Sequence, residues 1–213
     1  MDRDLGSIRR EFTKHALKIN DLHTNPVEQF HQWMEEALTA KVNEPNAMVL
    51  ATASAQGIPS ARTVLLKQYN AEGFTFFTNY KSKKAQEIEE NPHGFLLFYW
   101  SELERQIRIT GNIARVQKEL SDRYFRERPE ESRIGAWASP QSQPIPNRTY
   151  LENLVEDYKR IFEKKEIKRP DYWGGYRVKP TRFEFWQGRP SRLHDRIEYY
   201  LEDRIWKIHR LAP

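Results

Sequence analysis

Apolar residues recur along the chain with two different periods, and the change between them divides the chain into segments. After the polar residues 1–24, Val27, Phe30 and Met34 are spaced as on one face of a helix. The preceding asparagine is a favourable N-cap, and Pro26 suits the first helical position. We therefore predict a helix that begins at Pro26, preceded by a mobile N-terminal arm over residues 1–24.

From residue 47 onward the apolar period changes to two, as expected for half-buried strands. Turn-forming residues such as Gly57 and Gly73 separate the alternating segments. A helix over 82–90 interrupts the strands and ends before Asn91-Pro92. The predicted strands cover residues 47–53, 62–69, 74–78, 94–100, 105–116, 176–179, 182–187, 193–201 and 204–211.

The second half of the chain contains two further predicted helices, over 118–128 and 147–165, with the proline-rich loop 139–146 between them. Closely spaced strands are typical of an antiparallel meander. No repeat or linker divides residues 25–213, so a single domain is predicted. Its fold class is mainly β with helices (α+β), as an antiparallel β-barrel flanked by helices.

Composition excludes several classes of protein. The 213 residues include 13% aromatic residues, enough to form a core, and no run of about 18 apolar residues that would span a membrane. The N-terminal segment mixes acidic and basic residues without an apolar run, so neither a secretory signal nor a transit peptide is expected. The absence of cysteine excludes disulfides, thiolate metal sites and cysteine nucleophiles. A cytoplasmic location is expected.

A net charge of +5 permits attraction to anions, from nucleic acids to small phosphorylated metabolites. Acidic and basic residues are interleaved along the predicted helices, and no long basic stripe with stacked aromatic residues occurs. The pattern therefore favours a small molecule over a nucleic acid.

Two basic groups lie near predicted element ends, where a phosphate could bind. Arg62 and Lys67 stand at the two ends of an apolar strand segment. Strict alternation places them on opposite faces, so they would serve different anions unless the strand contains a bulge. Lys83 and Lys84 follow Ser82 at a predicted helix start, where backbone N–H groups favour a phosphate. An ordinary solvated helix start is the alternative.

Tyr124, Arg128 and Ser132 recur at intervals of four, so at least the first two should share a helix face. Their hydroxyl and guanidinium groups suit a phosphate monoester, although tyrosine and arginine are also common at protein interfaces.

Arg192, His194 and Arg196 alternate near the C-terminus, and strand geometry would place them on one face. The nearby Trp186 and Gly188 suit a flat ring ligand, whereas an exposed, salt-bridged strand is the alternative. No metal-ligand histidine pair, nucleophile elbow, Walker loop or dinucleotide fingerprint occurs. We therefore expect no metal, and any chemistry must come from a bound cofactor.

The segment 183–196, FEFWQGRPSRLHDR, resembles the C-terminal signature of the pyridoxine/pyridoxamine 5′-phosphate oxidase family. The resemblance extends from about residue 8 to the end of the chain. Further matching segments, in order, are 62–67, 77–79, 82–85, 104–106, 134–137, 141–142, 172–175 and 210–213.

This resemblance implies an FMN-binding split-barrel domain that forms a homodimer with FMN at the interface. The implied reaction oxidises pyridoxine 5′-phosphate and pyridoxamine 5′-phosphate to pyridoxal 5′-phosphate, with reduction of dioxygen to hydrogen peroxide. The implied partners are these small molecules, with no nucleic acid and no membrane.

The resemblance also implies residue roles. Arg62 and Lys84 would bind the FMN phosphate, while Arg192 would clamp the substrate and His194 would orient it or accept a proton. The other implied flavin-site residues are Thr63, Val64, Leu65, Leu66, Lys67, Phe77, Thr78, Lys83, Gln106, Gln141, Ser142, Trp186 and Arg196. The implied substrate-site residues are Arg9, Lys67, Tyr124, Arg128, Ser132, Arg192, Leu193 and His194.

Two positions depart from the family's commonest pattern: Lys83 stands where arginine is frequent, and Phe12 where tyrosine is frequent. The alternative functions are another split-barrel flavoprotein, such as a flavin reductase, and a non-catalytic carrier of flavin or pyridoxal phosphate.

Overall fold

The structure, a computed structural model, describes residues 4, 5, 7 and 11–213. Spatial contacts group these residues into two compact units. The first contains the described residues up to Met48 together with Leu96–Thr110 and Thr181–Pro213. The second contains Val49–Phe95 and Gly111–Pro180. The prediction of one domain over 25–213 stays a prediction.

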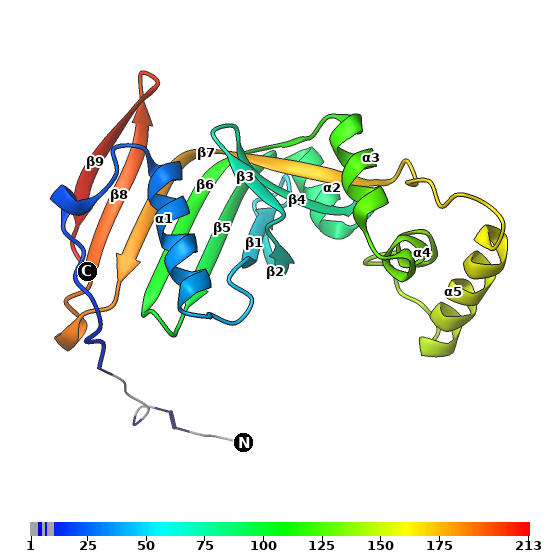
Figure 1. Ribbon diagram of the computed structural model, residues 1–213, viewed down its shortest axis with the longest axis horizontal. Coiled ribbons are helices and arrows are strands. Elements are labelled where there is room, and N and C mark those ends of the chain that lie inside the picture. Colours follow the sequence, from blue (N-terminus) through cyan, green and yellow to red (C-terminus); the bar gives the residue numbers. More distant parts are fainter. Residues whose placement is uncertain (1–3, 6, 8–10) are drawn as a thin grey trace. The chain divides into compact units, whose positions relative to one another are not determined.

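The described chain alternates strands and helices as Figure 1 shows. Its strands hydrogen-bond in the order β2-β1-β5-β6-β7-β4-β3, and β8 pairs with both β7 and β9. The pairs β3–β4, β4–β7, β7–β8 and β8–β9 are antiparallel, which agrees with the predicted meander. The elements are η1 (Ile19–Asp21), α1 (Pro26–Thr39), β1 (Ala47–Ala53), β2 (Pro59–Leu65), β3 (Gln68–Asn70), β4 (Gly73–Asn79), α2 (Lys83–Glu90), β5 (His93–Trp100), β6 (Arg105–Arg115), α3 (Lys118–Glu127), α4 (Glu130–Ala138), α5 (Arg148–Phe162), β7 (Trp173–Gln187), η2 (Pro190–Arg192), β8 (Asp195–Glu202) and β9 (Ile205–Leu211).

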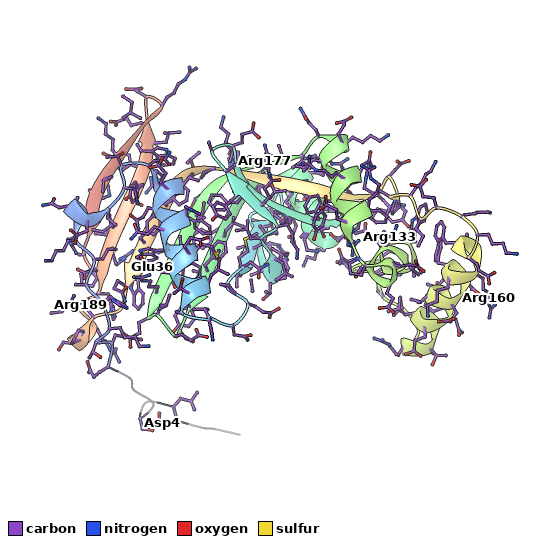
Figure 2. The ribbon with its side chains drawn as sticks, in the orientation of Figure 1. Asp4, Glu36, Arg133, Arg160, Arg177 and Arg189 are labelled. Atoms are coloured by element: carbon purple, nitrogen blue, oxygen red, sulfur yellow. The ribbon has the colours of Figure 1, made fainter. Side chains whose placement is uncertain are left out.

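Helix α1 contributes much of the core of the first unit. It begins at Pro26 as predicted, and Asn25 Oδ1 accepts a hydrogen bond of 2.9 Å from the N–H of Val27. Its buried face carries Phe30, whose ring centroid lies 5.2 Å from that of Phe98. Glu36, labelled on α1 in Figure 2, forms an ion pair with Arg105.

The second unit packs α3, α4 and α5 around an aromatic core beside the start of β7. Phe125 and Trp173 are buried in this cluster, and their ring centroids are 5.3 Å apart. At Gly73, which has a φ of 132°, a Cβ atom would lie 2.1 Å from the carbonyl oxygen of Val178. Glycine therefore permits the close approach of β4 and β7 at this point.

Helix α3 begins at Lys118 and ends within one residue of the predicted end, because Arg128 precedes Pro129 and adopts an extended ψ of 145°. Other parts of the secondary structure were predicted wrongly. The short helix α4 was not predicted, since its buried residues, Ile134, Ala136 and Ala138, alternate instead of following a helical period. The predicted break in β7 does not occur, and Pro180 lies within the strand.

Within the described part of the chain, no helix is both long and apolar enough to cross a membrane. The same residues contain no cluster of three or more His, Asp or Glu side chains that could hold a metal ion.

Candidate functional site

A cavity of about 910 Å³ lies in the second unit and collects most of the predicted ligand-binding residues. Its volume is typical of small-molecule and cofactor sites. Strands β2 and β4, the start of α2 and the α3–α4 turn all contribute to its lining. The predicted residues that line it are Arg62, Thr63, Val64, Leu65, Lys67, Phe77, Thr78, Lys83, Lys84, Tyr124, Arg128, Ser132, Gln141 and Ser142.

The guanidinium of Arg62 is held in place by a polar network at one side of this cavity. Its Nη1 donates to Thr52 Oγ1 at 2.5 Å, and its Nη2 lies 3.1 Å from Glu87 Oε2. The hydroxyl of Ser60 also donates to Glu87 Oε2, at 2.5 Å. Burial raises the pKa of Glu87, but the hydrogen bonds from Ser60, Thr52 and Arg62 outweigh it and leave the pKa below its usual value. Glu87 is therefore an ionised carboxylate that fixes the orientation of Arg62.

Lys84 lies in the first turn of α2 and is buried at the same cavity. Its Nζ is 3.2 Å from Thr78 Oγ1 and 3.3 Å from Gln141 Oε1. Burial, together with the positive charge of Arg62, lowers the pKa of Lys84 to about 8. An anion placed here would restore the charged form, so the site suits a phosphate at a helix N-terminus.

Arg62 and Lys67 line one cavity, which strict alternation did not predict. The reason is that β2 ends at Leu65, and Leu66 and Lys67 precede the separate strand β3. The N–H of Lys67 donates to the carbonyl oxygen of Thr75 at 2.9 Å. Leu66 is buried and is not among the cavity residues.

Tyr124, Arg128 and Ser132 all line the cavity, but they do not share one helix. Tyr124 is on α3, Arg128 is the residue that follows its last turn, and Ser132 is on α4. The prediction that Arg128 continues the helix face of Tyr124 was therefore wrong. The turn at Pro129 brings the three side chains to the same cavity instead.

Arg128 is a cation without an acidic partner among the described residues. Its Nη1 is buried, and no described atom accepts a hydrogen bond from it. Its Cζ lies 4.5 Å from the ring centroid of Trp173. Burial lowers the pKa of Arg128, and Tyr124 opposes this effect. A buried donor of this kind is a ready partner for an anionic ligand.

Arg192 and His194 lie in the first unit, in the turn before β8. Strand β8 begins at Asp195, so the prediction that Arg192, His194 and Arg196 share a strand face was wrong. Ser191 and Arg192 adopt the left-handed φ values of 55° and 61° and form the tight turn η2. Arg192 and Leu193 are exposed there, and Leu193 is 69% exposed.

The imidazole of His194 is fixed by its neighbours. The N–H of Arg189 donates to Nδ1 of His194 at 3.1 Å, and the Trp186 ring centroid is 4.6 Å from the imidazole centroid. Burial and the charge of Arg192 lower the pKa of His194. Neutral His194 therefore carries its proton on Nε2 and presents a donor there.

The N-terminal segment covers this turn in the first unit. The ring of Phe12 lies edge-on to Trp186 and to His194, each at a centroid distance of 5.8 Å. Glu11 Oε2 accepts a hydrogen bond from the N–H of Ser191 at 3.3 Å. Arg9, a predicted substrate residue, lies outside the described residues, and the mobility of residues 1–24 stays a prediction.

The remaining predicted residues differ in their surroundings. Arg196 donates through Nε and Nη2 to the carboxylate of Glu184 at 2.8 and 3.0 Å. Gln106 is half-buried on β6. Lys83 is largely exposed, and its Nζ lies 3.9 Å from Glu87 Oε1.

Sequence reasoning missed Glu87, Ser60 and Trp173. Glu87 counted only as one of the interleaved charges of the predicted helix over 82–90, yet only 5% of it is exposed. Ser60 precedes the segment predicted as a strand. Trp173 is present in a matching motif, but nothing in its spacing indicated that it would line the cavity.

Comparisons with family profiles and with known proteins match this chain to oxidases of phosphorylated pyridoxine vitamers. The profile described as pyridoxamine 5′-phosphate oxidase matches residues 34–161, and that of the pyridoxine 5′-phosphate oxidase C-terminal dimerisation region matches residues 173–213. A pyridoxine/pyridoxamine 5′-phosphate oxidase from Crocosphaera subtropica is 56% identical, with the alignment covering 99% of this chain and 100% of the relative.

Solved structures agree with the sequence comparisons. PhzG from Burkholderia lata, in complex with tetrahydrophenazine-1-carboxylic acid, superposes with a TM-score of 0.87 at 29% identity, covering 93% of this chain and 98% of that one. A pyridoxamine 5′-phosphate oxidase-related, FMN-binding protein from Nostoc punctiforme gives a TM-score of 0.69 at 18% identity, with coverages of 86% and 97%, and is similar in fold alone. The predicted fold class, an α+β split barrel with an antiparallel sheet, is confirmed.

Proposed function

The chain belongs to the pyridoxine/pyridoxamine 5′-phosphate oxidase family, and from this premise we propose how its own residues carry out the reaction. It is an FMN-dependent oxidase that converts pyridoxine 5′-phosphate and pyridoxamine 5′-phosphate to pyridoxal 5′-phosphate, and it forms a homodimer. When bound, FMN would supply the redox chemistry, a two-electron oxidation of the substrate coupled to the reduction of dioxygen to hydrogen peroxide. We propose a cytoplasmic location.

Arg62 and Lys84 would hold the phosphate of FMN at the start of α2. The buried Glu87 keeps Arg62 oriented, while Thr78 and Gln141 hold the amine of Lys84 at 3.2 and 3.3 Å. These residues fit a phosphate because they combine two cations with a helix N-terminus. Gln141 and Ser142, in the loop after α4, would complete this part of the flavin site.

Tyr124, Arg128 and Ser132, with Lys67, would bind the phosphate of the substrate. One observation carries this proposal. The cavity lined by Arg62 and Lys84 is also lined by a second pair of cations, Lys67 and Arg128. The buried Nη1 of Arg128 has no hydrogen-bond partner among the described residues. Two cationic groups in one cavity support two phosphorylated ligands. A flavin reductase or simple carrier would not require the second group.

Arg192 and His194 would contact the pyridine ring of the substrate. The exposed guanidinium of Arg192 would clamp the ring, and neutral His194 would donate from Nε2, because the N–H of Arg189 occupies Nδ1 at 3.1 Å. Orienting the pyridine ring positions its reactive 4′ carbon, which lowers the entropic part of the barrier.

The purified protein is expected to be yellow, to release FMN on denaturation, and to produce hydrogen peroxide when incubated with pyridoxine 5′-phosphate in air. Peroxide and aldehyde formation are measured together, with unphosphorylated pyridoxine as the control substrate. A yellow protein that forms no aldehyde from either phosphorylated vitamer would support the carrier instead, and a colourless one that cannot bind FMN would contradict both.

FMN affinity is expected to fall as pH rises through the pKa of Lys84. In the apoprotein this pKa is about 8, so Lys84 is mostly charged at pH 7 and mostly neutral at pH 9. A bound phosphate requires the charged form, so the dissociation constant should be about tenfold larger at pH 9 than at pH 7. Flavin fluorescence quenching at constant ionic strength measures this change.

Riboflavin, which lacks the phosphate, is the matched ligand control and should show no such pH dependence. The Lys84→Arg variant should also lose it, because arginine stays charged over this range. Equal affinities of the unaltered protein for FMN at both pH values would contradict the role of Lys84.

A further inference from the structure

Arg128 binds a phosphate at a lower entropic cost if its guanidinium is already oriented before the ligand arrives. No acidic side chain among the described residues holds it, and its buried Nη1 has no acceptor there. Its Cζ instead lies 4.5 Å from the ring centroid of Trp173 and 5.7 Å from that of Phe125. The contacts that orient this cation are therefore aromatic faces, which attract a guanidinium without neutralising its charge.

Trp173 is itself firmly held. It is the first residue of β7, where it pairs with Asn79 of β4, and its N–H donates to the carbonyl oxygen of Pro170 at 3.0 Å. Its carbonyl oxygen accepts from Arg169, whose Nε donates to Asp122 at 2.6 Å. Only 7% of Trp173 is exposed. The indole plane is therefore fixed from both the backbone and the core.

The indole of Trp173 belongs to an aromatic cluster that also contains Tyr124, another residue proposed to bind the substrate phosphate. Phe77 lies parallel to Trp173, with a centroid distance of 5.6 Å and an interplanar angle of 10°. Tyr124 stacks on Phe77 at 3.9 Å and 15°. Trp173 thus lies against the guanidinium of Arg128, and its ring is also nearly parallel to that of Tyr124, with a centroid distance of 6.2 Å and an interplanar angle of 5°.

We propose that Trp173 is a positioning residue for the substrate phosphate: its indole face holds the guanidinium of Arg128 open toward the cavity. This inference rests on the proposed function and deepens it, because it names what makes the Arg128 group selective for a phosphorylated substrate. A carboxylate in place of the indole would orient Arg128 equally well but would compete with the phosphate. The aromatic face avoids that competition.

The test compares Trp173→Leu and Trp173→Phe in the FMN-loaded protein. Trp173→Leu is expected to raise KM for pyridoxine 5′-phosphate about tenfold while kcat changes less than about twofold. Trp173→Phe should recover part of this loss, because it restores an aromatic face under Arg128. The dissociation constant of pyridoxal 5′-phosphate, measured by calorimetry, should rise in parallel and needs no turnover.

Trp137→Leu is the matched control. Trp137 packs in the same aromatic cluster, with centroid distances of 5.5 Å to Phe162 and 5.9 Å to Tyr158, and does not line the cavity. Its loss should lower the melting temperature and leave KM unchanged. If Trp173→Leu also lowers only the melting temperature, Trp173 is merely a core residue and the proposal is overturned.

A double-mutant cycle separates this proposal from the function on which it rests. In the Arg128→Ala background, Trp173→Leu should change the dissociation constant of pyridoxal 5′-phosphate less than about twofold, since its target side chain is gone. A full tenfold effect in that background would overturn the positioning role. If the unaltered protein binds the phosphorylated ligand but oxidises neither vitamer, the proposed oxidase function fails while the cycle still tests Trp173.

Discussion

Arg128→Ala is expected to lower kcat/KM for pyridoxine 5′-phosphate by about 10²–10³-fold, with FMN still bound. A guanidinium that donates to a phosphate contributes charge-assisted hydrogen bonds of about 1.5–3 kcal/mol each. Losing about 3–4 kcal/mol of transition-state binding corresponds to this change in rate constant. The buried Nη1 without a partner among the described residues is the structural reason to expect a large effect at this position. Steady-state peroxide formation measures it.

Two controls apply to Arg128→Ala: a substrate without a phosphate, and a variant that keeps the positive charge. Unphosphorylated pyridoxine should be oxidised equally slowly by the variant and the unaltered protein, because it has no phosphate for Arg128 to bind. Arg128→Lys should recover part of the activity, since lysine keeps the charge but loses the two-pronged geometry. An equal loss with both substrates would show that Arg128 supports the fold of the cavity and does not bind phosphate.

The sequence predicted helices and strands well where an apolar period and a capping or turn residue occur together. Helix α1 begins at Pro26 as predicted, because Asn25 supplies a local cap. Local patterns failed where non-local packing decides, as at α4, which is held against the aromatic core around Trp173. Strand β7 likewise continues through Pro180, where the local pattern predicted a break.

The candidate site shows a similar limit. Arg62 and Lys84 could be identified because a charge at an element end is a local signal. Glu87 could not, because its burial depends on Thr52, Ser60 and Arg62, which are distant in sequence. Alternation also misled the interpretation of Arg192, since the left-handed residues Ser191 and Arg192 form a turn where a strand was expected.

Arg192→Ala is the second change with a large expected effect. We expect kcat/KM for pyridoxine 5′-phosphate to fall about 10²-fold, the equivalent of losing one or two charge-assisted hydrogen bonds in the transition state. FMN content should stay the same, since Arg192 is not among the residues that line the cavity with Lys84. Absorbance of the released flavin and initial rates of aldehyde formation give the two measurements.

Backbone strain has to be separated from side-chain loss at this position, because Arg192 has a φ of 61°. Alanine and arginine have similar strain in the left-handed region, so Arg192→Ala isolates the guanidinium, whereas Arg192→Gly also relaxes the turn. If the clamp is the guanidinium, both variants should lose activity to a similar degree, although Arg192→Gly has the less strained backbone. Full activity of Arg192→Ala with normal FMN content would refute the clamp. If Arg192→Ala loses both activity and FMN, Arg192 binds the cofactor instead of the substrate.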